Sequence, residues 1–295
     1  MICELVKKDI SFFDVLRILK NYGNVYYHGI KDKNAYTSQL ICFEDYDFEG
    51  ILNLRSEKFL LKNFRFSDKK PKRKNLRGNY FKINYYSEEE IDFDEKVEEV
   101  NEKGFPNFYG PQRFGYKNNL YVSINYLRGD YEKAAYYLIP ENLRKYFWNW
   151  DKIYENLKYE HWIEKIFVDK LRKDKDFEEA FNSIPKYVLN IIIKSFASYV
   201  FNLTLSKLIE YGEKIPKKLP VIGRKMKVKD EKIKEIIKEI LDREGISIND
   251  LPFKSYYRIS FVYPENLKIY NNTIEFFLIK GAYATVLLKY LILED

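Results

Sequence analysis

At residues 29–39 the chain reads GIKDKNAYTSQ, directly after a short apolar segment. One carboxylate, Asp32, stands between Lys31 and Lys33 in this stretch. Neighbouring cations favour the ionised form of an Asp, and an ionised carboxylate is the form that acts as a covalent nucleophile. The run Lys-Asp-Lys-Asn equally suits a solvated turn in which the Asp caps the backbone. The residue pattern alone leaves both interpretations open.

A second informative stretch, at residues 106–115, reads PNFYGPQRFG. It places amide, aromatic and guanidinium groups between glycines, namely Asn107, Phe108, Tyr109, Gln112 and Arg113. These groups can grip a planar base that has left its stack. The alternative is a tight turn whose aromatic rings fold into the core. The density of polar groups in one loop favours a ligand site.

Length and composition indicate a globular protein. The chain has 295 residues, 46% of them hydrophobic, which is enough for one large domain or two ordinary ones. The net charge of +7 suits a polyanionic partner without proving one. Because no G-x-G, Walker A or G-x-S-x-G pattern occurs, the dinucleotide, nucleotide-phosphate and serine-hydrolase motifs are excluded.

Cysteine and histidine usage argues against a disulfide scaffold and a metal site. The two cysteines fit a reducing compartment, and no Cys/His cluster has zinc spacing, so we expect no metal. The first residues contain no signal-peptide core. Lys194 interrupts the longest apolar region, residues 187–205, so we expect no membrane association and a cytoplasmic location.

Two basic loops are candidates for RNA contact. The first runs from Asp68 to Lys74 and carries Lys69, Lys70, Lys72, Arg73 and Lys74, which we predict to contact RNA phosphates. The second covers residues 214–218 and 224–227. A run of cations is also typical of a plain solvated loop, so this alternative remains beside the functional one.

The order of expected elements suggests an insertion. Strands are expected near residues 3–7, 24–28, 38–43, 58–66, 79–86 and 120–124, helices dominate from 131 to 244, and strands return at 256–263 and 273–280 before a last helix at 284–293. We therefore predict an α+β fold. Its catalytic domain would be residues 1–129 plus 251–295, interrupted by a helical insertion domain at 130–250.

Three segments, in this order along the chain, resemble motifs of the TruD family of tRNA pseudouridine synthases. Residues 29–39 resemble the family pattern G-x-K-D-[KR]-x-A-x-T-x-Q, and residues 106–115 resemble P-N-[YF]-[FY]-G-x-Q-R-F-G. Residues 280–288, KGAYATVLL, resemble its C-terminal G-[SA]-[FY]-A-T-x-[VL]-[LV] segment. Weaker matches lie at 78–83 and 195–202. Three long matches in family order form a specific signal.

The resemblance implies a pseudouridine synthase core, with a mixed, mainly antiparallel sheet flanked by helices and a helical insertion of the TRUD type. It implies isomerisation of a uridine in tRNA, at position 13 in the D-arm, without cofactor or metal. Asp32 matches the family's catalytic Asp. Whether this carboxylate attacks the sugar or the base of the uridine stays open. Asn107 would hydrogen-bond the base, Tyr109 (or, as second choice, Phe108) would stack on it, and Tyr283 would line the pocket.

Two departures from the family pattern affect these expectations. The family begins with a longer segment containing a basic residue, and without it we expect one pocket wall to be missing or rebuilt. Phe108-Tyr109 also inverts the commoner aromatic order. The cation beside Asp32 could be Arg258, Lys31 or Lys33. The alternatives to a monomeric enzyme are a non-catalytic RNA-binding protein or RNA chaperone on the same scaffold, and a basic protein-interaction module.

Overall fold

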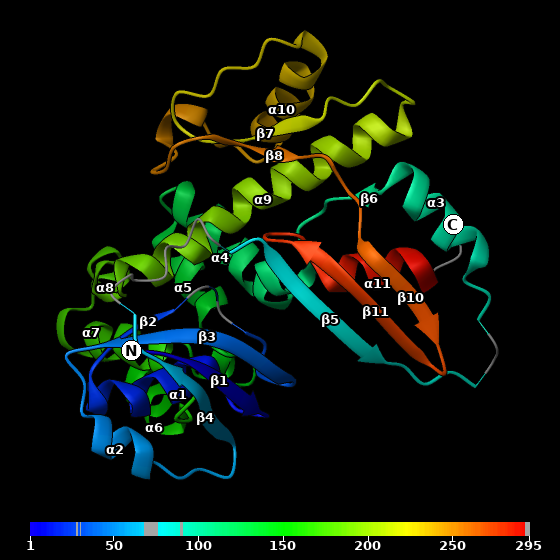
Figure 1. The fold of residues 1–295 in the computed structure, drawn as a ribbon. Coiled ribbons are helices and arrows are strands. Elements are labelled where there is room, and N and C mark those ends of the chain that lie inside the picture. The colour runs from blue at the N-terminus through cyan, green and yellow to red at the C-terminus, as the bar shows by residue number, and fades with distance from the viewer. Residues whose placement is uncertain (28, 30, 68–75, 89–90, 293–295) are drawn as a thin grey trace. The chain divides into compact units, whose positions relative to one another are not determined.

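The computed structural model describes residues 1–27, 29, 31–67, 76–88 and 91–292. These residues belong to two compact units, Met1–Gly78 and Asn79–Asp295. Figure 1 shows the elements of each unit. The first basic loop, with Lys69, Lys70, Lys72, Arg73 and Lys74, lies outside the described residues, so its RNA contacts remain a prediction.

The first unit is a four-stranded antiparallel sheet of order β2-β3-β1-β4 with two helices on one face (Figure 1). Its elements are β1 (Ile2–Lys8), α1 (Phe12–Leu19), the 3₁₀ helix η1 (Lys20–Tyr22), β2 (Asn24–Tyr27), β3 (Tyr36–Glu44), α2 (Phe48–Asn53) and β4 (Phe59–Arg65). Ser11 begins α1 by accepting a hydrogen bond from the backbone N–H of Phe13.

One hydrophobic core holds this unit together. Alternation along β1 turns Cys3 and Leu5 towards the helices, and Ile41 lies opposite Cys3 on β3. The helices α1 and α2 fill the other side with their own buried apolar side chains, which are Phe12, Val15, Leu16, Leu19 and Ile51. The same face of β1 continues to Lys7, where the apolar pattern stops.

The second unit contains a three-stranded sheet, β10-β11-β5, and two short two-stranded ribbons, β6-β9 and β7-β8. The strands are β5 (Gly78–Asn84), β6 (Phe105–Pro106), β7 (Lys218–Val221), β8 (Tyr256–Ile259), β9 (Phe261–Val262), β10 (Glu265–Tyr270) and β11 (Thr273–Ile279). Helices α3 (Asp94–Lys103) and α11 (Ala284–Ile292) share a core with alternate residues of β11, namely Ile274, Phe276 and Leu278.

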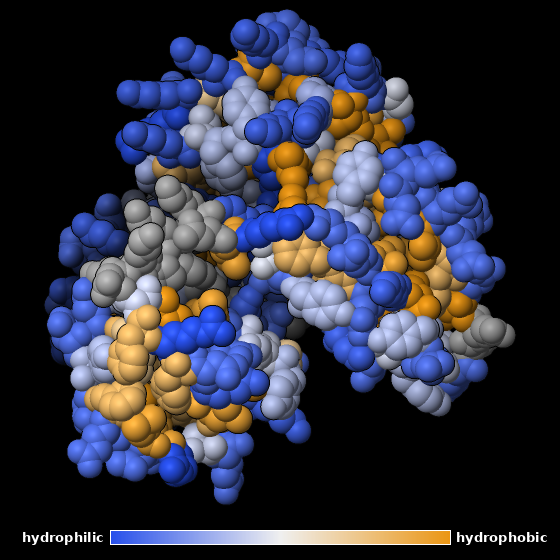
Figure 2. Space-filling view, in the orientation of Figure 1, coloured by the Kyte–Doolittle hydropathy of each residue, from blue (hydrophilic) through white to orange (hydrophobic). Residues whose placement is uncertain are grey.

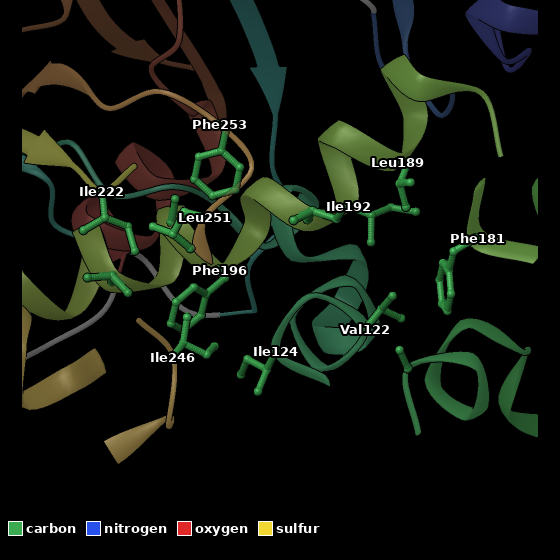
Figure 3. Close-up of a cluster of buried hydrophobic side chains, with 14 of the residues drawn as sticks. Val122, Ile124, Phe181, Leu189, Ile192, Phe196, Ile222, Ile246, Leu251 and Phe253 are labelled. Atoms are coloured by element: carbon green, nitrogen blue, oxygen red, sulfur yellow. The ribbon is translucent and has the colours of Figure 1, made fainter. Parts of the chain in front are cut away.

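The middle of this unit is helical. It comprises η3 (Pro111–Lys117), α4 (Asn118–Leu127), α5 (Tyr131–Leu138), η4 (Glu141–Tyr146), α6 (Trp150–Asn156), α7 (Trp162–Asp174), α8 (Phe177–Ser183), α9 (Lys186–Glu210), α10 (Glu231–Arg243) and η5 (Ile248–Asp250). Helix α9 is long and apolar enough to cross a membrane by length and composition, but it is largely buried. Its Ile192 and Phe196 belong to the helical core in Figure 3, so α9 is a core helix here.

The predicted α+β class with antiparallel sheets is confirmed. The predicted boundaries at 129–130 and 250–251 fall inside the second unit, near the limits of its helical core, and they remain a prediction. The strand expected at 120–124 is wrong, because these residues belong to helix α4. There Ser123 donates a hydrogen bond to the Ile193 carbonyl of α9, so packing against α9 overrides the β-like composition.

Candidate active site

Asp32 lies in the segment between β2 and β3, as the sequence predicts. Its side chain is exposed, and its carboxylate forms no hydrogen bond with any described residue. Lys31 is half-buried beside it, and burial lowers the pKa of Lys31 while the Asp32 charge opposes that shift. Asp32 therefore lies in the connection between two strands, next to Lys31, and its catalytic role stays a prediction.

A second cation near Asp32 is Lys7 of β1, which sequence reasoning missed. Its ammonium donates a hydrogen bond to the main-chain carbonyl of Asp32. Lys7 is only 1% exposed, and burial lowers its pKa, opposed by the charges of Asp32 and Asp9. The signal was present in the strand alternation, which puts residue 7 on the same inner face as Cys3 and Leu5.

In the second unit, the loop after β6 carries Asn107. Its backbone N–H donates to the Ser260 carbonyl (2.8 Å) and its side-chain N–H to the Ile259 carbonyl (2.9 Å). Its Oδ1 accepts a hydrogen bond from Arg258 at 2.6 Å. An amide has two N–H donors and two lone pairs, so one donor and one lone pair of the Asn107 side chain have no hydrogen-bond partner among the described residues. Contact between Asn107 and a base therefore stays a prediction.

Arg258 of β8 is fixed by this loop. Its Nε donates to the Asn107 carbonyl at 3.0 Å, and its guanidinium carbon lies 4.0 Å from the centre of the Tyr109 ring. Burial lowers the pKa of Arg258, and no carboxylate of a described residue pairs with it. A half-buried guanidinium without an anionic partner is suited to binding an anionic group of a ligand.

Tyr109 is 8% exposed, and its position is determined by helix α9. Asn202 of α9 accepts a hydrogen bond from the Tyr109 N–H (2.8 Å) and donates to its carbonyl (3.0 Å). The Tyr109 hydroxyl lies 2.6 Å from that of Tyr256. Burial raises the pKa of Tyr109, so its hydroxyl is neutral at physiological pH. The ring also lies against Phe201, with centroids 5.6 Å apart, and the Arg113 guanidinium lies 5.9 Å from its centre. Stacking of a base on Tyr109 therefore stays a prediction.

Tyr283, directly before α11, lies next to this cluster. Its ring meets the Tyr109 ring edge to face, with centroids 6.1 Å apart. Gly110 packs closely against Tyr283, because a Cβ atom at position 110 would come within 2.8 Å of the Tyr283 ring. Any larger residue at position 110 would therefore force either the loop or the side chains around it, Tyr283 among them, to shift.

A cavity of about 540 Å³ adjoins the loop. Half-buried Phe108 lines it, together with Tyr109, Gly110, Pro111, Phe114, Leu120, Tyr199, Asn202, Thr285, Val286 and Lys289. The walls are mainly apolar and aromatic, with a few polar groups, as is typical of a small-molecule pocket. Phe108, the second choice for stacking, is thus more accessible than Tyr109.

The structure brings five predicted residues together in the second unit, namely Asn107, Phe108, Tyr109, Arg258 and Tyr283. Asp32 and Lys31 belong to the first unit. Among the described residues no group of acidic, histidine or cysteine side chains could hold a metal ion. Besides Lys7, sequence reasoning missed Asn202 and Tyr256, although Asn202 closes one of the weaker motif matches.

The model of the family described as tRNA pseudouridine synthase D (TruD) matches residues 1–220. The chain belongs to the TruD family. Relatives with this name align over nearly the whole chain. The probable tRNA pseudouridine synthase D of Nanoarchaeum equitans is 32% identical, covering 98% of this chain and 86% of the relative. The tRNA pseudouridine synthase D of Aquifex aeolicus is 28% identical, and the match covers 99% of this chain and 91% of that relative.

A solved structure shows the same fold. A Methanosarcina mazei chain, named as a candidate tRNA pseudouridine synthase D (TruD), superposes with a TM-score of 0.68 at 22% identity. The match covers 99% of this chain and 87% of that one. The TruD motifs at 29–39 and 106–115 both lie within the part that the family model matches.

Proposed function

We propose that this protein is a tRNA pseudouridine synthase that converts one uridine, at position 13 of the D-arm, to pseudouridine. The N1–C1′ bond of the uridine breaks, a C5–C1′ bond forms, N1 gains a proton and C5 loses one to solvent. The observation that carries the proposal is the TruD family match over residues 1–220, which includes the Asp32 segment.

Asp32 is the proposed nucleophile, whether it attacks the sugar or the base. A carboxylate that is exposed and free of hydrogen bonds to described residues is available to a substrate. A uridine inside folded RNA must first leave its stack to be reached. We assign the holding of the extruded base to Asn107, Tyr109 or Phe108, and Tyr283, with Arg258 binding an anionic group.

Charge supports an RNA substrate. Residues 214–229 carry seven cations and residues 251–264 carry two, with no acidic residue in either segment. None of these cations forms an ion pair with a described residue. Hydrophilic side chains are prominent over β7, β8 and α10 (Figure 2). Arg258 belongs to this same ribbon, so phosphate contacts along it would lead towards the base-holding loop.

The test uses transfer RNA with tritium at C5 of its uridines. Because isomerisation replaces the C5–H bond, each turnover releases one tritium into water. Derivatisation that adds mass to pseudouridine then maps the modified position. Tritium release with a single mass-shifted site at position 13 is the expected result. Tight tRNA binding without tritium release would instead support the non-catalytic RNA-binding alternative.

A further inference from the structure

Lys7 occupies a position that the fold would normally give to an apolar side chain. Residues 3, 5 and 7 of β1 share the inner face of the sheet, and all three are at most 1% exposed. Cys3 and Leu5 fill the core there, but residue 7 introduces an ammonium. Burying a charge is costly unless it is hydrogen-bonded or paired.

The hydrogen bond that Lys7 forms explains this placement. Its ammonium donates to the main-chain carbonyl of Asp32, and a bond of this kind is stronger than one between neutral groups. The sheet ladder does not extend to Asp32, because β2 ends at Tyr27 and β3 begins at Tyr36. Among the described residues, Lys7 alone forms a hydrogen bond with Asp32.

The surroundings of Lys7 contain few competing groups. The charges that act on it are those of Asp32 and Asp9. Across the strands it pairs with Thr37 of β3 and Phe59 of β4. The nearby Gln39, opposite Leu5, is 9% exposed, and its amide has no hydrogen-bond partner among the described residues. The inner face therefore ends in polar groups just where the sheet meets the Asp32 turn.

We propose that Lys7 is the positioning residue of Asp32, holding its main chain in place and supplying a positive charge beside its carboxylate. This inference rests on the proposed function, since it assigns a role relative to Asp32 as nucleophile. A carboxylate on an otherwise unpaired turn would sample many positions, and misplacement of a reacting group by about 1 Å can cost about 100-fold in rate.

The experiment measures turnover, tRNA affinity and thermal unfolding of Lys7→Met, which keeps the length of the side chain without its charge. We expect kcat to fall by about 100-fold with KM for tRNA unchanged. Tm should stay equal or rise, since replacing a buried charge by an apolar group is often neutral or stabilising. The matched control is Lys8→Met, at the exposed neighbouring position, which should keep wild-type kcat.

A purely structural Lys7 would change Tm and leave kcat of the folded protein intact, and that result would overturn the proposal. Lys7→Gln is the second variant, because it keeps an N–H donor for the Asp32 carbonyl without the charge. We expect the kcat of Lys7→Gln to be intermediate between those of wild type and Lys7→Met. A wild-type kcat in folded Lys7→Gln would overturn the role proposed for the charge. If the wild-type protein forms no pseudouridine, the proposed function is refuted. Failure of the proposed function can therefore be told apart from failure of the role proposed for Lys7.

Discussion

The guanidinium of Arg258 stacks on the Tyr109 ring, with its central carbon 4.0 Å from the ring centre. Such a contact fixes both side chains, because the ring attracts the cation and the cation covers one ring face. Asn107 accepts two hydrogen bonds from the same guanidinium, so three of the predicted substrate-binding residues, Asn107, Tyr109 and Arg258, form one cluster. Substitutions within it should affect turnover together.

Removing the Tyr109 ring should slow the reaction. Tyr109→Ala should cost about 1–3 kcal/mol in kcat/KM, the range found for loss of a base–aromatic stack. Tyr109→Phe should retain most of the activity, because it keeps the ring and loses the hydroxyl, which contacts Tyr256 and interacts with Arg258. Steady-state tritium release measures both variants. If Phe108→Ala is impaired and Tyr109→Ala is not, the second-choice ring is the stacking residue.

Asn202 should contribute to the stability of the folded protein, because it holds the main chain of Tyr109 through two hydrogen bonds. We expect Asn202→Ala to lower the free energy of unfolding by about 1–3 kcal/mol, as two backbone groups lose their partner. Urea denaturation checks this value. Asn190→Ala, at an exposed position of the same helix, is the matched control and should change stability little. Equal stability of the two variants would contradict the role given to Asn202.

The basic ribbon, defined as strand β7 with its flanking cations at residues 214–229, should determine the salt dependence of tRNA binding. The combined change of Lys217, Lys218 and Lys225 to Gln should reduce the slope of log K against log salt by about 2–3. Filter binding at several salt concentrations measures the slope. The control changes Lys170 and Lys173, whose ammonium groups already pair with carboxylates on α7. An unaltered slope in the ribbon variant would show that these lysines do not contact phosphates.

Stability should depend on pH through Lys7. Burial lowers its folded-state pKa below that of a free lysine, so between these two values the unfolded chain binds more protons than the folded one. The contribution of Lys7 to the free energy of unfolding therefore rises as pH increases towards 10.5, the ordinary lysine value. We expect the stability advantage of Lys7→Met to be largest near neutral pH and to shrink on the alkaline side. Chemical denaturation from pH 7 to 10 tests this sign, and a growing advantage would contradict it.

The sequence predicts the fold where local signals and tertiary packing agree. The strands on both sides of Asp32 follow clear alternation, and Arg258 lies on the predicted C-terminal strand. Local composition misleads at residues 120–124, because contacts with α9 decide their conformation. The partners of Asp32 and Tyr109 could not be predicted locally, since Lys7 and Asn202 lie 25 and 93 residues away from them. Such pairs depend on strand and helix packing rather than on spacing.

The most direct test of the central claim compares Asp32→Asn with wild type on tRNA tritiated at C5 of its uridines. Asn keeps the size of the side chain but cannot form the carboxylate. We predict no detectable tritium release and no mass-shifted pseudouridine, while tRNA binds with wild-type affinity. Turnover of Asp32→Asn at the wild-type rate would contradict Asp32 as the nucleophile.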